Sequence, residues 1–197
     1  GLIAKDGIEI AHAFRLLEVT KTEQHFEIEH VTAPVVLSVL RNFSVPVKLT
    51  LSLSDDDLAF LMAHDTDDFN RWNAAQQLGV NVLLHMIGAY KKGHPENVSA
   101  NYLRAFGNVL SASNLDKALK ARLITLPDED YLAELMPYAD VDAIHIVRES
   151  VCRELAEKFK PVLNKLFIEN QEAIYKFDSD SIAKRSIRNM CLAYLSR

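Results

Sequence analysis

Residues 39–76, VLRNFSVPVKLTLSLSDDDLAFLMAHDTDDFNRWNAAQ, decide the fold. Before Ser54 the apolar residues recur at every second position, the spacing that places them on one face of a strand. After Ser54 they recur at every third and fourth position, which is the spacing of one helix face. The sequence therefore predicts a mostly α-helical chain with an N-terminal β part that ends near residue 53.

Four segments before Ser54 are predicted strands. The clearest is 46–53, where Val47, Leu49, Leu51 and Leu53 alternate with polar residues. Residues 1–7 are expected to form a strand end and a turn, and 21–23 a hairpin loop. The other predicted strands are 8–19, 24–31 and 35–40. Because such a sheet leaves one face without a partner, we expect part of an immunoglobulin-like sandwich whose N-terminal strands lie outside this sequence.

Helices are predicted from Ser54 to the last residue. Ser54 followed by three aspartates is a typical helix N-terminus, and Asp57 can complete a capping box. Later helices are expected to begin at Ser99, at Ser113 or Asn114, and with Pro127 in a first turn. The predicted ranges are 54–64, 68–92, 99–110, 113–123, 126–136, 140–171 and 179–197.

Pro161 lies inside the longest predicted helix, which indicates either one kinked helix or two abutting helices. On the last helix, the buried face is expected to contain Ala183, Ile187, Met190, Cys191 and Tyr194. Short antiparallel helices with short loops are typical of an α-solenoid-like bundle, as in armadillo or HEAT proteins. The sequence contains no strict repeat that would demonstrate a true repeat array.

The composition excludes several classes of protein. The 197 residues carry a formal net charge of -5, which argues against a nucleic-acid partner or an anionic membrane surface. No apolar run reaches the roughly 18 residues of a spanning helix, and no signal-peptide pattern is present. Cys152 and Cys191 lie in apolar helical stretches and are expected to be buried, reduced thiols. We therefore expect a cytoplasmic protein with no membrane and no nucleic-acid partner.

The histidines do not form a recognisable metal motif. None of the seven lies in an H-E-x-x-H arrangement, which places two ligands one helical turn apart. His25 and His30 are five residues apart, so on a strand their side chains would face opposite ways. His64 with Asp65, Asp67 and Asp68 resembles a ligand cluster, but helix capping explains the same residues. No metal-ligating residue is therefore predicted in this chain.

Nucleophilic and basic residues also lack a catalytic context. Neither cysteine is paired in sequence with a histidine base, and no G-x-S-x-G turn, P-loop or dinucleotide fingerprint occurs. Two small basic clusters are interpreted as solvated helix faces or as contacts with a neighbouring domain: Lys158 with Lys160, and Lys184 with Arg185 and Arg188. No catalytic or substrate-binding residue is predicted here.

Two long phrases, PVVLSVLRNFSVPVKL and SDDDLAFLMAHDTDDFNRWNAAQ, closely resemble the bacterial aminopeptidase N family, the zinc-dependent alanyl aminopeptidases. Val45 departs from the alanine that is common there. The phrases LITLPDEDYLAEL and SIAKRSIRNMCLAYL are similar to the same family, so the resemblance runs from about residue 8 to the end. The residues that fit are Arg41, Phe43, Ser44, Pro46, Val47, Lys48, Leu49, Ser54, Asp55, Leu58, Phe60, Leu61, His64, Phe69, Arg71, Trp72, Ala74, Ala75 and Gln76.

The resemblance implies that residues 1–53 are the C-terminal part of an immunoglobulin-like β-sandwich, and that 54–197 begin a helical C-terminal domain. It places the zinc ligands, the motif for the substrate amino terminus and the transition-state tyrosine in the rest of the polypeptide. Zinc is thus expected in the parent enzyme but not in this chain. The region would link and cap the catalytic domain of the same polypeptide, which acts on peptide substrates.

A different class remains open, namely a stand-alone helical scaffold or protein-interaction module without catalysis. The sequence upstream of Gly1 would discriminate between the two. An H-E-x-x-H motif with a downstream glutamate ligand supports the enzyme, and an immediate start codon supports the scaffold.

Overall fold

The computed structural model describes residues 1–10, 16–47 and 49–197. Helices dominate these residues, which confirms a mostly α chain with an N-terminal β part. In chain order the elements are β1 (Leu2–Ala4), β2 (Val35–Leu37), the 3-10 turn η2 (Arg41–Phe43), α1 (Asp55–His64), α2 (Asp68–Lys91), α3 (Ala100–Ser111), α4 (Lys117–Leu123), α5 (Glu129–Glu134), α6 (Val141–Glu169) and α7 (Ser179–Leu195).

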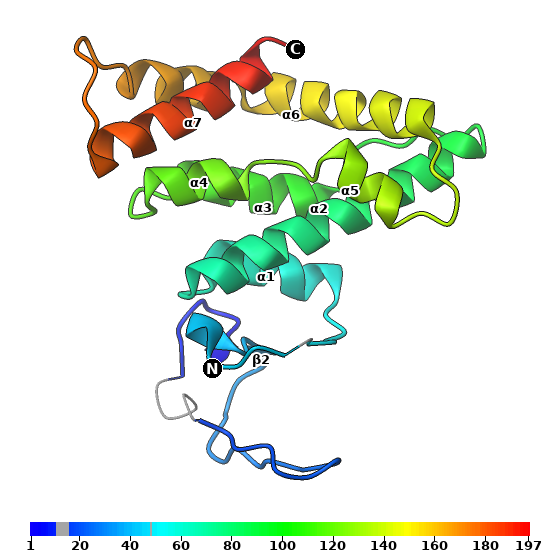
Figure 1. The fold of residues 1–197 in the computed structure, drawn as a ribbon, viewed down its shortest axis with the longest axis vertical. Coiled ribbons are helices and arrows are strands. Elements are labelled where there is room, and N and C mark those ends of the chain that lie inside the picture. Colours follow the sequence, from blue (N-terminus) through cyan, green and yellow to red (C-terminus); the bar gives the residue numbers. More distant parts are fainter. Residues whose placement is uncertain (11–15, 48) are drawn as a thin grey trace.

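The helices stack in tiers above the N-terminal segment (Figure 1). Helices α1 and α2 lie nearest to that segment, and α6 and α7 form the tier farthest from it. Helix α1 packs on α2 and α3, α2 reaches across to α6, and both α4 and α6 pack on α7. Buried apolar side chains from Ile3 to Tyr194 form one continuous core, so the strands and the helices share it.

The helix termini follow the capping rules that the sequence predicts, with two corrections. Ser54 accepts a hydrogen bond from the Asp57 N–H at 3.1 Å, and the Asp57 carboxylate accepts one in return, so the capping box is present. Helix α4 begins at the cap residue Asp116, and not at Ser113 or Asn114. Helix α5 is capped by Asp128, so Pro127 precedes the helix and does not lie in its first turn. In both cases a carboxylate accepts the free N–H groups of the first turn.

Pro161 does not divide the longest helix. Residues on both sides of it belong to α6, so the interpretation as two abutting helices is wrong. Pro161 is exposed, whereas Leu155 and Leu163 are buried on the packed face. The apolar stripe that packs on α7 therefore continues through the proline.

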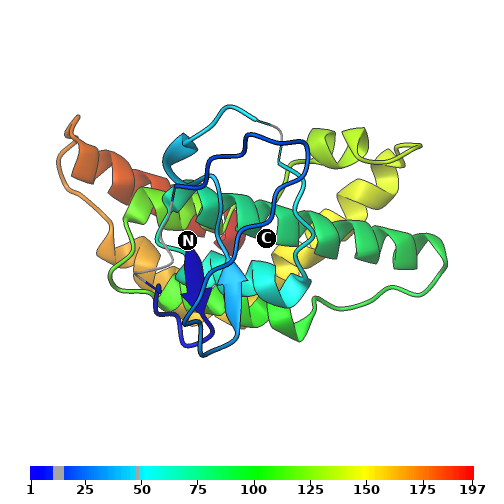
Figure 2. The same ribbon diagram turned by 90° about the horizontal axis from the view of Figure 1, so that it is seen from below.

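The two strands pair antiparallel, with Leu2 opposite Leu37 and Ala4 opposite Val35. Figure 2, which is seen from below, shows them side by side in front of the helices. The expected turn after the first strand is present, because the Gly7 N–H donates to the Ala4 carbonyl oxygen at 2.8 Å. The predicted strand at 35–40 is confirmed only to Leu37.

In the described residues, the other predicted strands do not form. Residues 24–31 and the described residues of 46–53 are irregular, while Lys48 and residues 11–15 of the first predicted strand lie outside the described residues. The alternating pattern identifies a face for burial against a second sheet, but a strand also needs a hydrogen-bonded neighbour. Among the described residues β1 and β2 form the paired sheet, and Glu9 adds only an isolated antiparallel bridge to Ile3. Apolar side chains such as Val19 and Val47 remain exposed.

In the described part of the chain, no helix is both long enough and apolar enough to span a bilayer.

Candidate functional site

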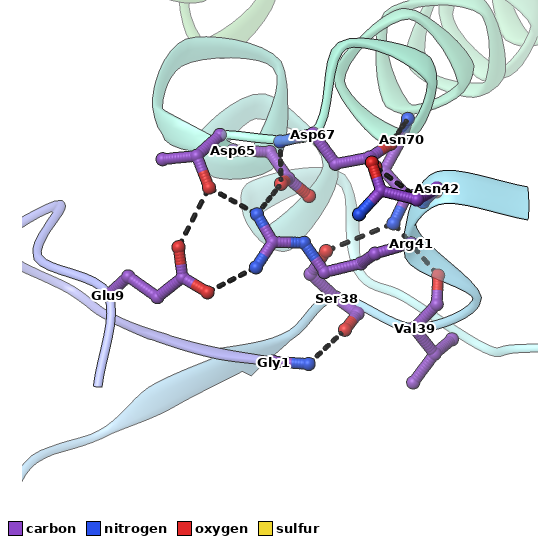
Figure 3. Close-up of polar contacts among 10 residues, drawn as sticks. Gly1, Glu9, Ser38, Val39, Arg41, Asn42, Asp65, Asp67 and Asn70 are labelled. Atoms are coloured by element: carbon purple, nitrogen blue, oxygen red, sulfur yellow. Dashed lines mark hydrogen bonds and ion pairs between the residues drawn. The ribbon is translucent and has the colours of Figure 1, made fainter. Parts of the chain in front are cut away.

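A cluster of charged and polar side chains connects the N-terminal segment to the turn between α1 and α2 (Figure 3). We call it the polar joint. Arg41 lies at its centre, with two carboxylates and a hydroxyl around the guanidinium. Its members are Glu9, Arg41, Asp65, Thr66, Asp67 and Asn70.

Arg41 is the first residue of η2, and three residues separate it from the end of β2. Leu40 before it adopts a left-handed backbone with φ of 53°, which turns the chain away from the strand. The guanidinium binds the Glu9 carboxylate and the Thr66 hydroxyl, and its Nη2 lies 3.5 Å from Asp65 Oδ1. Only 9% of the Arg41 side chain is exposed. A buried guanidinium needs such partners for its fixed fork of donors, so these contacts determine how the segment attaches to the helices.

Asp65 is the buried member of the joint, between α1 and α2. Its side chain is 0% exposed. Oδ1 accepts the Asp67 N–H at 2.9 Å, and within the described residues Oδ2 accepts no hydrogen bond. Burying a carboxylate is costly unless it is paired, and the Arg41 charge is its counterpart here. Asp65 therefore makes the helical side of the joint dependent on Arg41.

Asp67 connects the start of α2 to the segment after β2. Its Oδ1 caps α2 by accepting the Asn70 N–H at 2.9 Å, and its Oδ2 accepts the Asn42 N–H at 2.8 Å. The Asn70 amide donates to Ser38 Oγ at 3.0 Å and to the Val39 carbonyl oxygen at 2.8 Å. One helix N-terminus is thus hydrogen-bonded to backbone and side chains of the N-terminal segment.

Aromatic contacts extend the joint along α2. The rings of Phe43 and Phe69 lie 4.5 Å apart between centroids, and those of Phe69 and Trp72 5.7 Å apart. Arg71 donates from Nε to the Met62 carbonyl oxygen at 2.8 Å, and so satisfies a free carbonyl at the end of α1. The turn between α1 and α2 is therefore held by contacts from η2 on one side and from α2 on the other.

The charges of the joint favour particular protonation states. Burial alone would raise the pKa of Glu9, but the hydrogen bond from Thr66 and the hydrogen bond and charge of Arg41 outweigh it, and the Glu9 pKa is lowered. Burial, followed by the positive charge of Arg71, lowers the pKa of His64. The joint thus holds an ionised Glu9 beside a cation, an arrangement suited to structural attachment.

The structure places the histidines of the sequence analysis apart. His25 and His30 are exposed and lie near different glutamates, His25 at 3.5 Å from Glu23 and His30 at 3.9 Å from Glu29. Across the ranges 1–10, 16–47 and 49–197, no group of three or more His, Cys, Asp or Glu side chains could hold a metal ion. The His64 ring packs on Phe60 with centroids 4.9 Å apart.

The aspartates after His64 have three different roles. Asp67 is a helix cap, as the sequence predicts. Asp68 is the first residue of α2, where its charge suits the positive end of the helix dipole. Asp65 is the C-cap residue of α1, where its backbone N–H donates to the Leu61 carbonyl oxygen, and its side chain is buried in the polar joint.

Both cysteines are free and buried. Burial raises the pKa of the Cys152 thiol, and it raises the pKa of Cys191 to about 11. A thiol needs to ionise before it can act as a nucleophile, so both side chains suit a packed core.

The basic cluster on α7 is engaged within its own tier. Lys184 Nζ lies 3.2 Å from Glu172 and 2.5 Å from Asp180. Arg185 lies over the Tyr175 ring and Arg188 over the Phe167 ring, each at 4.7 Å from the centroid. Solvated faces alone do not account for this cluster, because its cations organise the connection between α6 and α7.

Sequence reasoning missed most of the polar joint. Arg41 could have been identified as a candidate for a buried ion pair, since it is a lone charge between two apolar segments. Glu9, Thr66 and Asn70 are ordinary polar residues that nothing in the sequence singles out. Only the fold brings Glu9 and Thr66 to Arg41, and Asn70 to Ser38.

Comparisons with known proteins agree with this architecture. Residues 1–52 match the family described as a domain of unknown function (DUF3458) with an Ig-like fold, and residues 55–197 match the one described as DUF3458_C, ARM repeats. The chain is 37% identical over 181 residues to aminopeptidase N of Escherichia coli (strain K12), which is 92% of this chain and 21% of that protein. It is 31% identical over 198 residues to aminopeptidase N of Caulobacter vibrioides, covering 100% of this chain and 22% of that protein.

A solved structure has the same fold. The crystal structure of Legionella pneumophila aminopeptidase A in complex with aspartic acid matches with a TM-score of 0.81 and 29% identity, over 99% of this chain and 23% of that one. The chain thus spans about a fifth of the length of these relatives. It belongs to the DUF3458_C ARM-repeat family, preceded by a DUF3458 Ig-like segment, and is a region of the aminopeptidase N-type proteins.

Proposed function

We propose that this region is the non-catalytic framework of a zinc-dependent aminopeptidase that removes N-terminal amino acids from peptides in the cytoplasm. The Ig-like segment links the helices to the catalytic domain of the same polypeptide. The helical tiers cap that domain and limit access to its active site.

The polar joint is the observation that carries this proposal. A flexible linker would leave its polar side chains in solvent, whereas Arg41 and Asp65 are buried where the segment meets the helices. The shared apolar core adds to this attachment. A rigid connection is what a linking and capping role requires, because a cap that moves freely cannot define an opening.

Zinc belongs elsewhere in the proposed enzyme. The described residues of this chain offer no cluster of metal ligands, and the titratable groups of the polar joint are already paired. These residues do not fit a zinc site. We therefore assign no chemical step to them and place metal and substrate recognition in the rest of the polypeptide.

The test compares the full-length polypeptide with the 197-residue chain in the release of alanine or arginine from chromogenic amides. We expect turnover by the full-length polypeptide that a chelator abolishes and zinc restores, and none by the chain alone. Turnover by the chain alone would overturn the framework role. A full-length polypeptide that is folded but inactive with zinc would overturn the enzyme assignment and favour a scaffold.

A further inference from the structure

The connection between α6 and α7 projects an apolar tip into solvent. Ile174 and Tyr175 are each 73% exposed and Phe177 is 84% exposed. Ile168 at the end of α6 and Ile182 at the start of α7 are also exposed, at 66% and 41%. Figure 1 shows this connection as a loop beyond the helical tiers, far from the polar joint. We call the residues 174, 175 and 177 the apolar tip.

Polar contacts hold the backbone that carries the apolar tip. Lys184 pairs with Glu172 on the α6 side of the loop, and the Ser181 N–H donates to Asp178 Oδ1 at 2.9 Å on the α7 side. Between them, Arg185 Nη1 donates to the Lys176 carbonyl oxygen at 2.9 Å. The loop is thus anchored at both ends and in the middle. Ile174 and Phe177 are largely exposed, and Tyr175 remains 73% exposed although Arg185 lies over its ring.

This arrangement is unusual for a surface loop. Connecting loops normally carry small or polar side chains, and contiguous exposed apolar patches mark interaction sites. Two aromatic residues and an isoleucine within four positions supply a large contact area with few rotatable bonds. A loop anchored in this way loses little conformational freedom on binding, which favours docking.

The charges around the apolar tip indicate which partner it fits. Residues 165–185 contain four cations (Lys165, Lys176, Lys184, Arg185) and four anions (Glu169, Glu172, Asp178, Asp180), so their net charge is zero. A site for an anionic membrane would instead carry an excess of lysine and arginine. A neutral rim around an apolar centre is typical of protein–protein contacts.

We propose that the apolar tip docks into an apolar recess elsewhere in the same polypeptide. The curated relatives extend far beyond the matched region, which is only 21% or 22% of their length, so most of such a polypeptide is available as partner. The inference rests on the proposed function, since it assumes that this region caps another domain. It names the surface through which that contact is made.

Hydroxyl-radical footprinting of the full-length polypeptide tests the docking. The measured quantity is the oxidation rate of each side chain in the folded protein, divided by its rate in urea. Tyr138, which is 87% exposed and lies between α5 and α6, serves as the matched tyrosine for Tyr175. Tyr175 is 73% exposed and Phe177 84% exposed in this fold alone. If docking leaves less than about a fifth of each side chain exposed, its oxidation ratio should be at least about fourfold lower than that exposure allows.

Two variants sharpen the test. Phe177→Asp should restore rapid oxidation of Tyr175, because a carboxylate cannot enter an apolar recess unpaired, whereas Phe177→Leu should leave Tyr175 protected. Unprotected Tyr175 in the wild-type protein would overturn the proposal. Protection that requires high protein concentration, which indicates a second copy, or added anionic vesicles would overturn it as well.

The same preparation is assayed for release of amino acids. Protection of Tyr175 in a protein without aminopeptidase activity would refute the proposed function and leave the docking intact. Aminopeptidase activity with an unprotected Tyr175 would refute the docking and leave the proposed function intact.

Discussion

Replacing Arg41 with alanine should destabilise the attachment of the N-terminal segment to the helices. The change removes the contacts with Glu9, Asp65 and Thr66 and leaves the buried Asp65 without its counter-charge. Removing one partner of a fully buried ion pair costs about 3–5 kcal/mol. Glu9 is 25% exposed and the Asp65 contact is 3.5 Å long, so we expect the lower part of that range or slightly less, about 2–3 kcal/mol.

Urea denaturation of the 197-residue chain, followed by tryptophan fluorescence, measures this loss. Trp72 is the only tryptophan and lies in the aromatic row beside the joint. A loss of this size corresponds to about 5–10 °C in melting temperature for a chain of this length. Arg41→Lys should fall between wild type and Arg41→Ala, since one ammonium keeps the charge but not the fork of donors.

Arg104→Ala provides the control, because Arg104 is exposed and its change should stay within about 0.5 kcal/mol. The effects of Arg41→Ala and Asp65→Ala should not add, since the two residues share one interaction. If Arg41→Ala costs no more than the control, or if its effect adds fully to that of Asp65→Ala, then Arg41 does not stabilise the attachment through Asp65.

Three further predictions concern stability, and the same denaturation assay measures each of them. Gly79→Ala should lower the free energy of unfolding, because the added Cβ would lie 2.9 Å from Pro127 Cδ. In the same helix, the Cβ of Gly88→Ala meets nothing within 4 Å, so this variant should be more stable by about 0.5–1 kcal/mol. Changes in stability of the same sign for both variants would contradict this. Lys120→Met should cost about 1–3 kcal/mol, since the buried ammonium donates to the carbonyl oxygens of Leu110 and Ala112, while Lys158→Met on an exposed position should cost little. The pKa of His64 is lowered in the folded chain, so the unfolded chain binds the proton first and stability is lost as the pH falls from above 6.5 through the folded-state pKa. His64→Gln should therefore reduce the loss of stability between about pH 7.5 and pH 5, and an unchanged pH profile would count against this role.

The helical part of the fold could be predicted closely because its signals are local. Ser54 with Asp57 identifies a helix start from four adjacent residues, and the buried face of α7 follows from spacing alone. Met190, the one predicted member of that face that is only partly buried, still packs against the core. At the start of α4, Ser113 and Asn114 both fit a cap and the sequence does not distinguish them. The residue that caps this helix is a third one, Asp116.

The strands could not be predicted in the same way, because a strand depends on a neighbour that is distant in sequence. Residues 46–53 have the strongest alternating pattern and the described ones form no strand, whereas Leu2–Ala4 is short and pairs with residues more than thirty positions away. The polar joint has the same origin. Glu9 and Thr66 are 57 residues apart and meet only because the helices carry Thr66 toward the N-terminal segment.

The zinc content of the purified full-length polypeptide and of the 197-residue chain shows whether this region supplies framework alone or also takes part in metal chemistry. We expect stoichiometric zinc in the full-length polypeptide, unchanged when His25, His30 and His64 are replaced, and none in the chain after dialysis. Stoichiometric zinc retained by the chain, or lost from the full-length polypeptide when those histidines are replaced while the protein remains folded, would contradict the framework role.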